Sequence, residues 1–244
     1  MSHESEGDPA ADHRPQLEAA RDGARGELAP ARFLRGGQAA GGPDRGSGRD
    51  EADALRAAAE PQRLLDLGFF HDKPLLSDAG AEHKVFLWQN RYVVKHTWPG
   101  TYGFVPVLEE GRFATRDASA PQYRHRLRLQ NAVFGDAIRE EGTISLPYEK
   151  GILDPQGESA FACVTSQPFR SGCTATLAKV GQFMEENGFR KAPHFHVWYR
   201  PADGILAADA HIGNFVEVDG ALFPIDLHLN QVPPQAFVKA GWPI

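Results

Sequence analysis

The chain has 244 residues, of which 41% are hydrophobic and 24% charged, enough for one globular domain with a polar tail. Its formal net charge of −6 argues against a protein that binds nucleic acids through a basic surface. No apolar run approaches the ~18 residues of a membrane span, and the N-terminus lacks a signal-peptide pattern. The two cysteines, Cys163 and Cys173, match neither a metal motif nor a disulfide-rich domain. These features favour a cytoplasmic protein.

The first 50 residues differ in composition from the rest. They are rich in Ala, Gly, Arg, Asp and Glu and contain few large apolar side chains. Such a segment cannot bury enough surface to offset the entropy lost on ordering, so residues 1–50 are predicted to be a disordered tail. A folded domain is expected over residues 51–244, beginning with a helical segment at 51–66 that Pro61 interrupts.

Two strands are predicted at residues 84–88 and 92–96, separated by a short turn. Gly80 stands shortly before the first strand, and Lys95 lies in the apolar run Val-Val-Lys of the second. A lysine in an apolar strand needs a partner for its charge, because an unpaired buried ammonium is costly. A bound phosphate is one such partner. The alternative is that Lys95 lies on the solvent-exposed face of an edge strand.

A helix is predicted over residues 121–139, with Pro121 in its first turn. Three arginines, Arg124, Arg126 and Arg128, alternate along it. Positions i, i+2 and i+4 spread over more than one helical face, and these arginines are therefore interpreted as part of a solvated surface.

Strands and a helix follow along the chain. The predicted elements are strands at 143–146 and 160–166, a helix over 174–187 and a strand at 194–199. The second of these strands ends in a Pro- and Gly-containing break at 167–172, and Asn187-Gly188 stops the helix. A turn at 201–204 then leads into a short apolar run.

The polar residues with the most informative spacing are Asp209, Asn214 and Asp226. Between the last two, residues 215–225 have the pattern of a strand, an Asp-Gly turn and a second strand. This hairpin would bring Asn214 and Asp226 to the same end, where their oxygen atoms suit Mg²⁺ held against phosphates. Asp209, one loop away, could orient a hydroxyl for attack on phosphorus, as phosphoryl transfer requires.

In this order the residues resemble the protein-kinase-like superfamily over about 66–230. Asp209 and Asn214 look like its catalytic-loop Asp-x-x-x-x-Asn, and Asp226 looks like its metal-binding Asp. The closest similarity is to the kinase-like domain of the polyvalent proteins of phages and mobile elements. The resemblance implies a phosphotransferase that moves the γ-phosphate of ATP to a hydroxyl acceptor, either a protein or a small molecule. Asp209 would act on the acceptor, Asn214 and Asp226 would bind Mg²⁺, and Lys95 would contact the phosphates of ATP.

The resemblance also implies a fold and a nucleotide site. The fold class would be α+β, a compact protein-kinase-like fold with an antiparallel N-terminal sheet, one helix and a truncated C-terminal lobe. The break at 167–172 resembles the linker between the two kinase lobes, whose backbone groups bind adenine. The residues implied in binding ATP are Gly80, Val85, Val93, Lys95, Gln167 and Phe169.

One position departs from the family. In kinases a Glu on this helix pairs with the strand lysine, whereas Gln122 stands at the aligned position. Its amide could accept a hydrogen bond from Lys95, and Glu109 or Glu110, from a preceding loop, could substitute for the missing carboxylate.

Two other functions are compatible with the sequence. A non-catalytic nucleotide-binding or interaction module would fit the short glycine loop, Gln122 and the small C-terminal part. A zinc-dependent hydrolase would use a His-x-His pair on one strand face together with two Asp-x-His pairs, namely His194 and His196, Asp209 and His211, and Asp226 and His228. ATP turnover separates a kinase from the first alternative, and bound zinc would identify the second.

Overall fold

The computed structural model describes residues 63–147 and 159–244. All of them belong to one compact unit of the chain. The predicted tail at 1–50, most of the predicted helical segment at 51–66 and the boundary between them lie outside the described residues.

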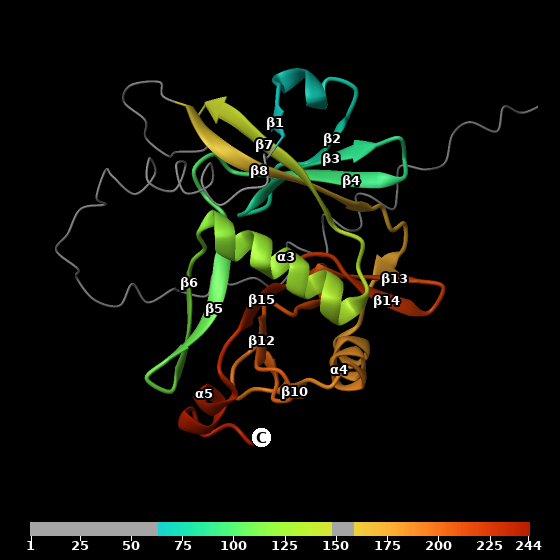
Figure 1. Cartoon of the computed structure of the whole chain (residues 1–244). Coiled ribbons are helices and arrows are strands. Elements are labelled where there is room, and N and C mark those ends of the chain that lie inside the picture. Colours follow the sequence, from blue (N-terminus) through green and yellow to red (C-terminus); the bar gives the residue numbers. More distant parts are fainter. Residues whose placement is uncertain (1–62, 148–158) are drawn as a thin grey trace, which may run out of the picture. The chain divides into compact units, whose positions relative to one another are not determined.

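A six-stranded sheet is built from strands that lie between Leu64 and Pro168 (Figure 1). Its strand order is β1-β7-β8-β4-β3-β2, and the neighbours are antiparallel except for the pair β1 and β7. The 3-10 helix η1 (Leu67–Phe70) follows β1. The strands are β1 (Leu64–Leu65), β2 (Leu75–Ser77), β3 (His83–Trp88), β4 (Tyr92–Thr97), β7 (Arg139–Pro147) and β8 (Ser159–Pro168).

The predicted strands at 84–88, 92–96, 143–146 and 160–166 are confirmed as β3, β4, β7 and β8. β3 and β4 form a hairpin in which Trp88 pairs with Tyr92. Its turn places Gln89 and Asn90 at φ 52° and 51°, a left-handed conformation that suits the twist of hairpin strands.

A separate hairpin of β5 (Phe104–Glu109) and β6 (Arg112–Asp117) was not expected from the sequence. The prediction of a loop is therefore wrong for Glu109, which ends β5, and holds for Glu110, which lies in the tight turn between the two strands. Pro106 within β5 weakens the strand pattern, but this sheet has only two strands, so a residue without an N–H is tolerated at its edge.

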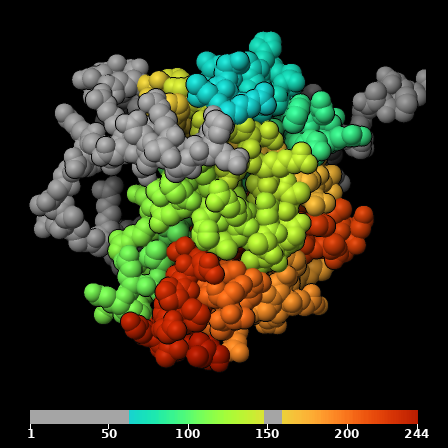
Figure 2. Space-filling model, in the orientation of Figure 1, coloured from blue at the N-terminus to red at the C-terminus, as the bar shows by residue number. Residues whose placement is uncertain are grey.

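Helix α3 (Ala120–Phe134) begins at Ser119, whose hydroxyl accepts from the backbone of Gln122 in a capping box. The helix ends at Gly135, which adopts φ 65°, so it is shorter than the predicted 121–139 and leaves Arg139 to begin β7. α3 packs against β15 and β5. In Figure 1 it crosses between the six-stranded sheet and the C-terminal strands, and it forms part of the surface seen in Figure 2.

The C-terminal part contains two small sheets, ordered β10-β11-β12-β15 and β14-β13-β9. The predicted helix at 174–187 is α4 (Leu177–Glu186), capped by the side chain of Thr176. The remaining elements are β9 (Cys173–Thr174), β10 (Arg190–Lys191), β11 (Trp198–Arg200), β12 (Ile205–Ala208), η2 (Ile212–Asn214), β13 (Phe215–Val218), β14 (Ala221–Pro224), β15 (His228–Gln231) and α5 (Pro234–Lys239). The described chain is thus mostly sheet with three α-helices, and the α+β class is confirmed.

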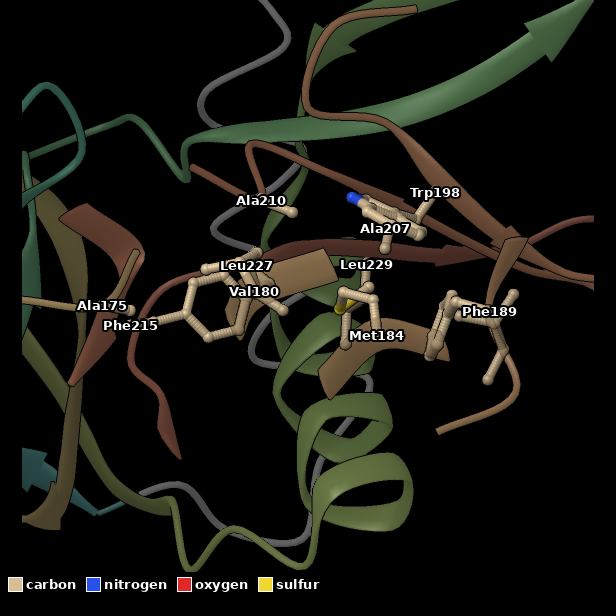
Figure 3. Packing of buried hydrophobic residues seen from close by; sticks show 11 residues of the cluster. Ala175, Val180, Met184, Phe189, Trp198, Ala207, Ala210, Phe215, Leu227 and Leu229 are labelled. Atoms are coloured by element: carbon tan, nitrogen blue, oxygen red, sulfur yellow. The ribbon is translucent and has the colours of Figure 1, made fainter. Parts of the chain in front are cut away.

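A hydrophobic core lies beneath the predicted catalytic loop (Figure 3). Ala210, Phe215 and Leu227 are buried there with Val180 and Met184 of α4. Each of the first three directly follows a predicted site residue, namely Asp209, Asn214 and Asp226. Packing of these apolar side chains therefore fixes the backbone on which the polar ones stand.

No helix in residues 63–147 or 159–244 is long and apolar enough to cross a membrane.

Candidate functional site

The hairpin of β13 and β14 brings Asn214 and Asp226 to the same end, as predicted. Phe215 pairs with Pro224 in the last rung of its ladder. Beyond this rung the backbone N–H of Ile225 donates to the carbonyl of Asn214 at 2.9 Å. Asp219 and Gly220 form the opposite turn with φ 50° and 83°, the left-handed conformations that an Asp-Gly turn supplies.

Asp209 follows β12 and has φ 60°, a conformation that is uncommon for a residue other than glycine and that occurs often at functional sites. The side-chain amide of Asn214 donates to both the carbonyl and the Oδ2 of Asp209, each at 2.8 Å. The side chain of Asp209 is still 42% exposed. Asn214 therefore holds the loop and one carboxylate oxygen, while the carboxylate remains accessible.

Lys95 reaches the same place from the six-stranded sheet. Its Nζ donates to the carbonyl of Ile225 at 2.8 Å, although the two residues are 130 positions apart. The bond ends on the residue that precedes Asp226. The structure therefore brings Lys95, Asn214 and Asp226 together, with Asp209 joined to them through Asn214.

The predicted nucleotide-binding side chains share one face of the sheet. Val85 is paired with Lys95, and Val93 is paired with Gln167. Cross-strand partners point to the same face, as do residues two apart on one strand. Val85, Val93, Lys95 and Gln167 thus line a common face.

Gly80 and Phe169 lie at the margins of that face. Gly80 is in the bend before β3, where its carbonyl accepts from the indole of Trp98 at 3.2 Å. Phe169 directly follows β8, and its backbone N–H donates to the carbonyl of Arg91 at 2.7 Å. This N–H is one of the groups expected to bind adenine, and it is used by the sheet instead.

Two of the three side chains expected to replace a helical glutamate have local partners instead of Lys95. The side chain of Gln122 accepts from the backbone and hydroxyl of Ser119 at 2.8 and 2.9 Å. Glu109 pairs with Arg116 on the β5–β6 hairpin. The predictions for Gln122 and Glu109 are therefore wrong, because each side chain serves its own local element, and the one for Glu110 stays a prediction.

The interpretation of the helical arginines as a solvated surface is also wrong for two of the three. Arg126 is 2% exposed and Arg124 is buried, while the side chain of Arg128 is 70% exposed. Arg124 lies 3.4 Å from a carboxylate oxygen of Glu140. Arg126 binds Glu82 at 2.8 Å and Asp226 at 2.9 Å.

Glu82 is a buried member of the site that the sequence did not indicate. Its carboxylate accepts from the backbone N–H of Phe104 at 3.0 Å and lies 2.7 Å from Nε2 of His228. Burial alone would raise the pKa of Glu82, but the charge of Arg126 and the contact with His228 outweigh it and lower the pKa to about 2. Glu82 is therefore an anion at neutral pH.

Asp226 is held from two sides. Its Oδ1 accepts from Arg126, and its Oδ2 lies 3.4 Å from Nδ1 of His83. Burial favours the neutral acid, but the charges of Lys95, His83 and Arg126 prevail and hold the pKa of Asp226 well below its ordinary value. With 31% of its side chain exposed, Asp226 presents an ionised oxygen donor beside Asn214.

The oxygen donors present fit Mg²⁺, which prefers carboxylate and amide oxygens. Ligand atoms of Glu82, His83 and Asp226 also lie within 4.8 Å of one another. That second group already surrounds a cation, because the guanidinium of Arg126 binds both carboxylates. Asp226 with Asn214 is thus the better place for a divalent ion.

The proposed zinc ligands are not arranged as predicted. β11 begins at Trp198, so His194 and His196 lie in a bend and turn rather than on a strand face. The His194 ring packs 5.1 Å from that of Phe113 and 5.9 Å from that of Trp242. His196 faces His211 at 5.8 Å, and burial, followed by the neighbouring His211, lowers the pKa of His196.

Comparison with known proteins identifies the family. The model of the family described as a serine/threonine/tyrosine kinase found in polyvalent proteins matches residues 50–230. Searches of curated proteins and of solved structures found no match. Because the match spans most of the chain and contains every predicted site residue, the chain belongs to the serine/threonine/tyrosine kinase family of polyvalent proteins.

Proposed function

We propose that the protein has a kinase-like fold and is a phosphotransferase that uses ATP and Mg²⁺ to phosphorylate a hydroxyl group of a protein or small molecule. The observation that carries the proposal is the bond from Lys95 to the carbonyl of Ile225. It joins a lysine on the sheet to the segment that holds Asn214 and Asp226. Membership in a kinase family supports the same reaction class.

Asp209 would bind the acceptor hydroxyl and take up its proton. Its exposed carboxylate can be reached from outside, and the bond from Asn214 fixes its direction. A carboxylate positioned in this way favours attack by the hydroxyl oxygen on the γ-phosphorus, while the bond from that phosphorus to the β–γ bridging oxygen breaks and ADP leaves.

Lys95 would contact the phosphates of ATP. Its ammonium now has a carbonyl partner, and a phosphate offers a stronger, charge-assisted bond. The shared face with Val85 and Val93 supplies apolar surface for the rest of the nucleotide.

Asn214 and Asp226 would hold the metal. Mg²⁺ would neutralise charge on the phosphates of ATP. Asp226 supplies the full negative charge, and Asn214 supplies a neutral oxygen while its amide nitrogen bonds to Asp209.

A non-catalytic nucleotide-binding module is the second candidate. It is favoured because Lys95 lacks the helical glutamate that pairs with the lysine in kinases. The α3 side chain that contacts Asp226 is an arginine and not an acid. In such a protein ATP would bind while the acceptor-side function of Asp209 was lost.

Two substitutions test the proposal. Asp209→Ala should keep ATP affinity and lose turnover by about 10²-fold or more, the range for a positioned acid–base group. Lys95→Ala should lose both turnover and some ATP affinity. The measurements are calorimetric ATP titration and phosphate release or self-labelling from γ-labelled ATP.

The exposed residues Asp117 and Lys239 provide matched controls, and their alanine variants should behave like the wild type. A wild type that binds ATP but neither hydrolyses it nor labels itself or any component of a lysate favours the non-catalytic module. An Asp209→Ala variant with full activity contradicts the assignment of Asp209.

A further inference from the structure

Arg126 connects three distant parts of the chain. It stands in the middle of α3 and is 2% exposed. Its Nη2 lies 2.8 Å from Oε2 of Glu82 and 2.9 Å from Oδ1 of Asp226. Its Nη1 donates to the carbonyl of Phe104 at 3.4 Å. A single guanidinium thus joins the start of β3, the β5–β6 hairpin and the end of the β13–β14 hairpin.

The Glu82 side of this link is rigid. Glu82 also accepts from the backbone N–H of Phe104 and contacts His228, so both carboxylate oxygens are engaged. Gly103 makes room for it, since a Cβ there would lie 2.3 Å from the carboxylate carbon. Glu82 therefore fixes Arg126 in place, and Arg126 in turn fixes one oxygen of Asp226.

Lys95 is not part of this link. Its recorded partner is the carbonyl of Ile225, and its charge stabilises the Asp226 anion. The charged side chain of α3 that contacts Asp226 is the cation Arg126, which binds the aspartate and not the lysine. Helix α3 is therefore connected to Asp226 directly.

We infer that Arg126, held by Glu82, is the positioning residue that orients Asp226 for binding a divalent cation. This inference rests on the metal-binding role in the proposed function. Arg126 takes one oxygen of Asp226 and His83 lies near the other. The carboxylate is thus fixed in one orientation, and its exposed portion is left for the ion.

Whether removal of Arg126 weakens or strengthens metal binding distinguishes a positioning role from a purely electrostatic one. A nearby cation repels Mg²⁺, so if Arg126 acted only through its charge, its removal would strengthen metal binding. If Arg126 orients Asp226, its removal weakens metal binding, as the loss of a partner that orients a metal ligand commonly does.

The test uses Arg126→Gln, Arg126→Lys and the double variant Glu82→Gln/Arg126→Gln. The double variant removes both buried charges together and so avoids leaving Glu82 without its counter-charge. Arg128→Gln is the control, because Arg128 is an exposed arginine on the same helix. ATP affinity is measured by calorimetry in EDTA and then over a range of Mg²⁺ concentrations, and Mn²⁺ binding is measured by electron paramagnetic resonance.

We expect the Mg²⁺ concentration for half-maximal enhancement of ATP binding to rise by roughly 10–100-fold in the double variant. ATP affinity in EDTA should stay unchanged, and Arg126→Lys should restore part of the loss. The Mn²⁺ titration should show the same order, with Arg128→Gln equal to the wild type.

The inference is overturned if the folded double variant keeps or improves the metal affinity of the wild type, or if the wild type binds neither Mg²⁺ nor Mn²⁺. These results differ from a failure of the proposed function. A wild type that binds Mg²⁺ and ATP without turnover contradicts phosphotransfer, while the metal comparison among the variants still decides the role of Arg126.

Discussion

Glu82 and Gly103 show how one buried charge constrains the residues around it. Glu82 is 7% exposed, its carboxylate contacts Phe104, Arg126 and His228, and Nδ1 of His83 lies 4.0 Å from it. A buried carboxylate with this many donors is stabilised as an anion, but only while all of them keep their positions. Gly103 is required both for its φ of 71° and for the space it leaves to the carboxylate.

Gly103→Ala should therefore be more destabilising than the same change at Gly135. Both glycines have left-handed backbones, with φ 71° and 65°, and each alanine pays about 1–2 kcal/mol for that conformation. Only at position 103 does the new Cβ also meet a neighbour, whereas nothing lies within 4 Å of a Cβ at 135. Urea unfolding of both variants measures the difference, and equal losses would refute the steric argument.

The charge of Glu82 should make stability depend on pH in the acid range. Its pKa is lowered from 4.5 to about 2 in the folded chain. Its contribution is therefore present above pH 4.5 and is lost as the pH falls toward 2. The contribution is roughly 3 kcal/mol.

The comparison is between the wild type and Glu82→Gln, with free energies of unfolding measured from neutral pH to pH 2. The glutamine variant should be less stable at neutral pH and should lose less on acidification. Glu185→Gln, on the exposed side of α4, is the control. An acid-range slope in Glu82→Gln as steep as that of the wild type would contradict the pKa assignment.

At the scale of elements, the ends of α3 are set by residues in it or next to it in the sequence, whereas its contacts in the site are made with residues far away in the sequence. Ser119, Pro121 and Gly135 set its ends by capping and backbone conformation. Pro121 lies within the segment and allowed the start of the helix to be predicted from sequence, whereas the stop at Gly135 was missed and the predicted helix ran to residue 139. The burial of Arg126 depends on Glu82 and Asp226, 44 and 100 positions away, and no pattern within the helix reveals those partners.

Gln122 should matter for the helix and not for nucleotide. Gln122→Ala and Ser119→Ala each remove part of the capping box, which should cost about 1 kcal/mol of stability. ATP affinity should be unchanged in both variants, because Gln122 does not contact Lys95. Thermal melts measure the change in stability, and calorimetric titrations measure ATP affinity. A loss of ATP affinity in Gln122→Ala alone would support the hydrogen bond to Lys95 that was expected from the sequence.

The hairpins also differ in how far the local sequence specifies them. The Asp-Gly turn and alternating residues at 215–225 specify β13 and β14 locally, and this hairpin alone places Asn214 beside Asp226. The β5–β6 hairpin was missed because Pro106 obscures its pattern. His194 and His196 were misplaced because an alternating run was interpreted as strand, where the chain instead turns with His196 at φ 57°.

At the scale of the whole molecule, the predicted tail at residues 1–50 should not contribute to stability. The composition of residues 1–50 offers little apolar surface to bury. Deletion of 1–49 should leave the melting temperature and the ATP affinity unchanged, and the family match begins at residue 50. A cooperative loss of several degrees on deletion would show that the segment is structural.

The site residues come from separated parts of the chain, and the sequence indicated those that carry recognisable chemistry. Lys95, Asp209, Asn214 and Asp226 were found by residue type, spacing and resemblance. The buried partners Glu82 and His83 were not found, Arg126 was interpreted as solvated and His228 as a zinc ligand, because charged residues in a sequence are usually solvated. Their function is visible only after folding brings opposite charges together.

The separation between Arg126 and Asp226 also has a consequence for biosynthesis. Arg126 leaves the ribosome 100 residues before its partner. At ordinary rates of translation this interval is about 5–20 s. During it Glu82 and Arg126 can pair with each other, but His228 and Asp226 are not yet made. The link between α3 and the metal-binding segment can therefore form only after Asp226 has been made, so the N-terminal half of the site waits for the C-terminal half during synthesis.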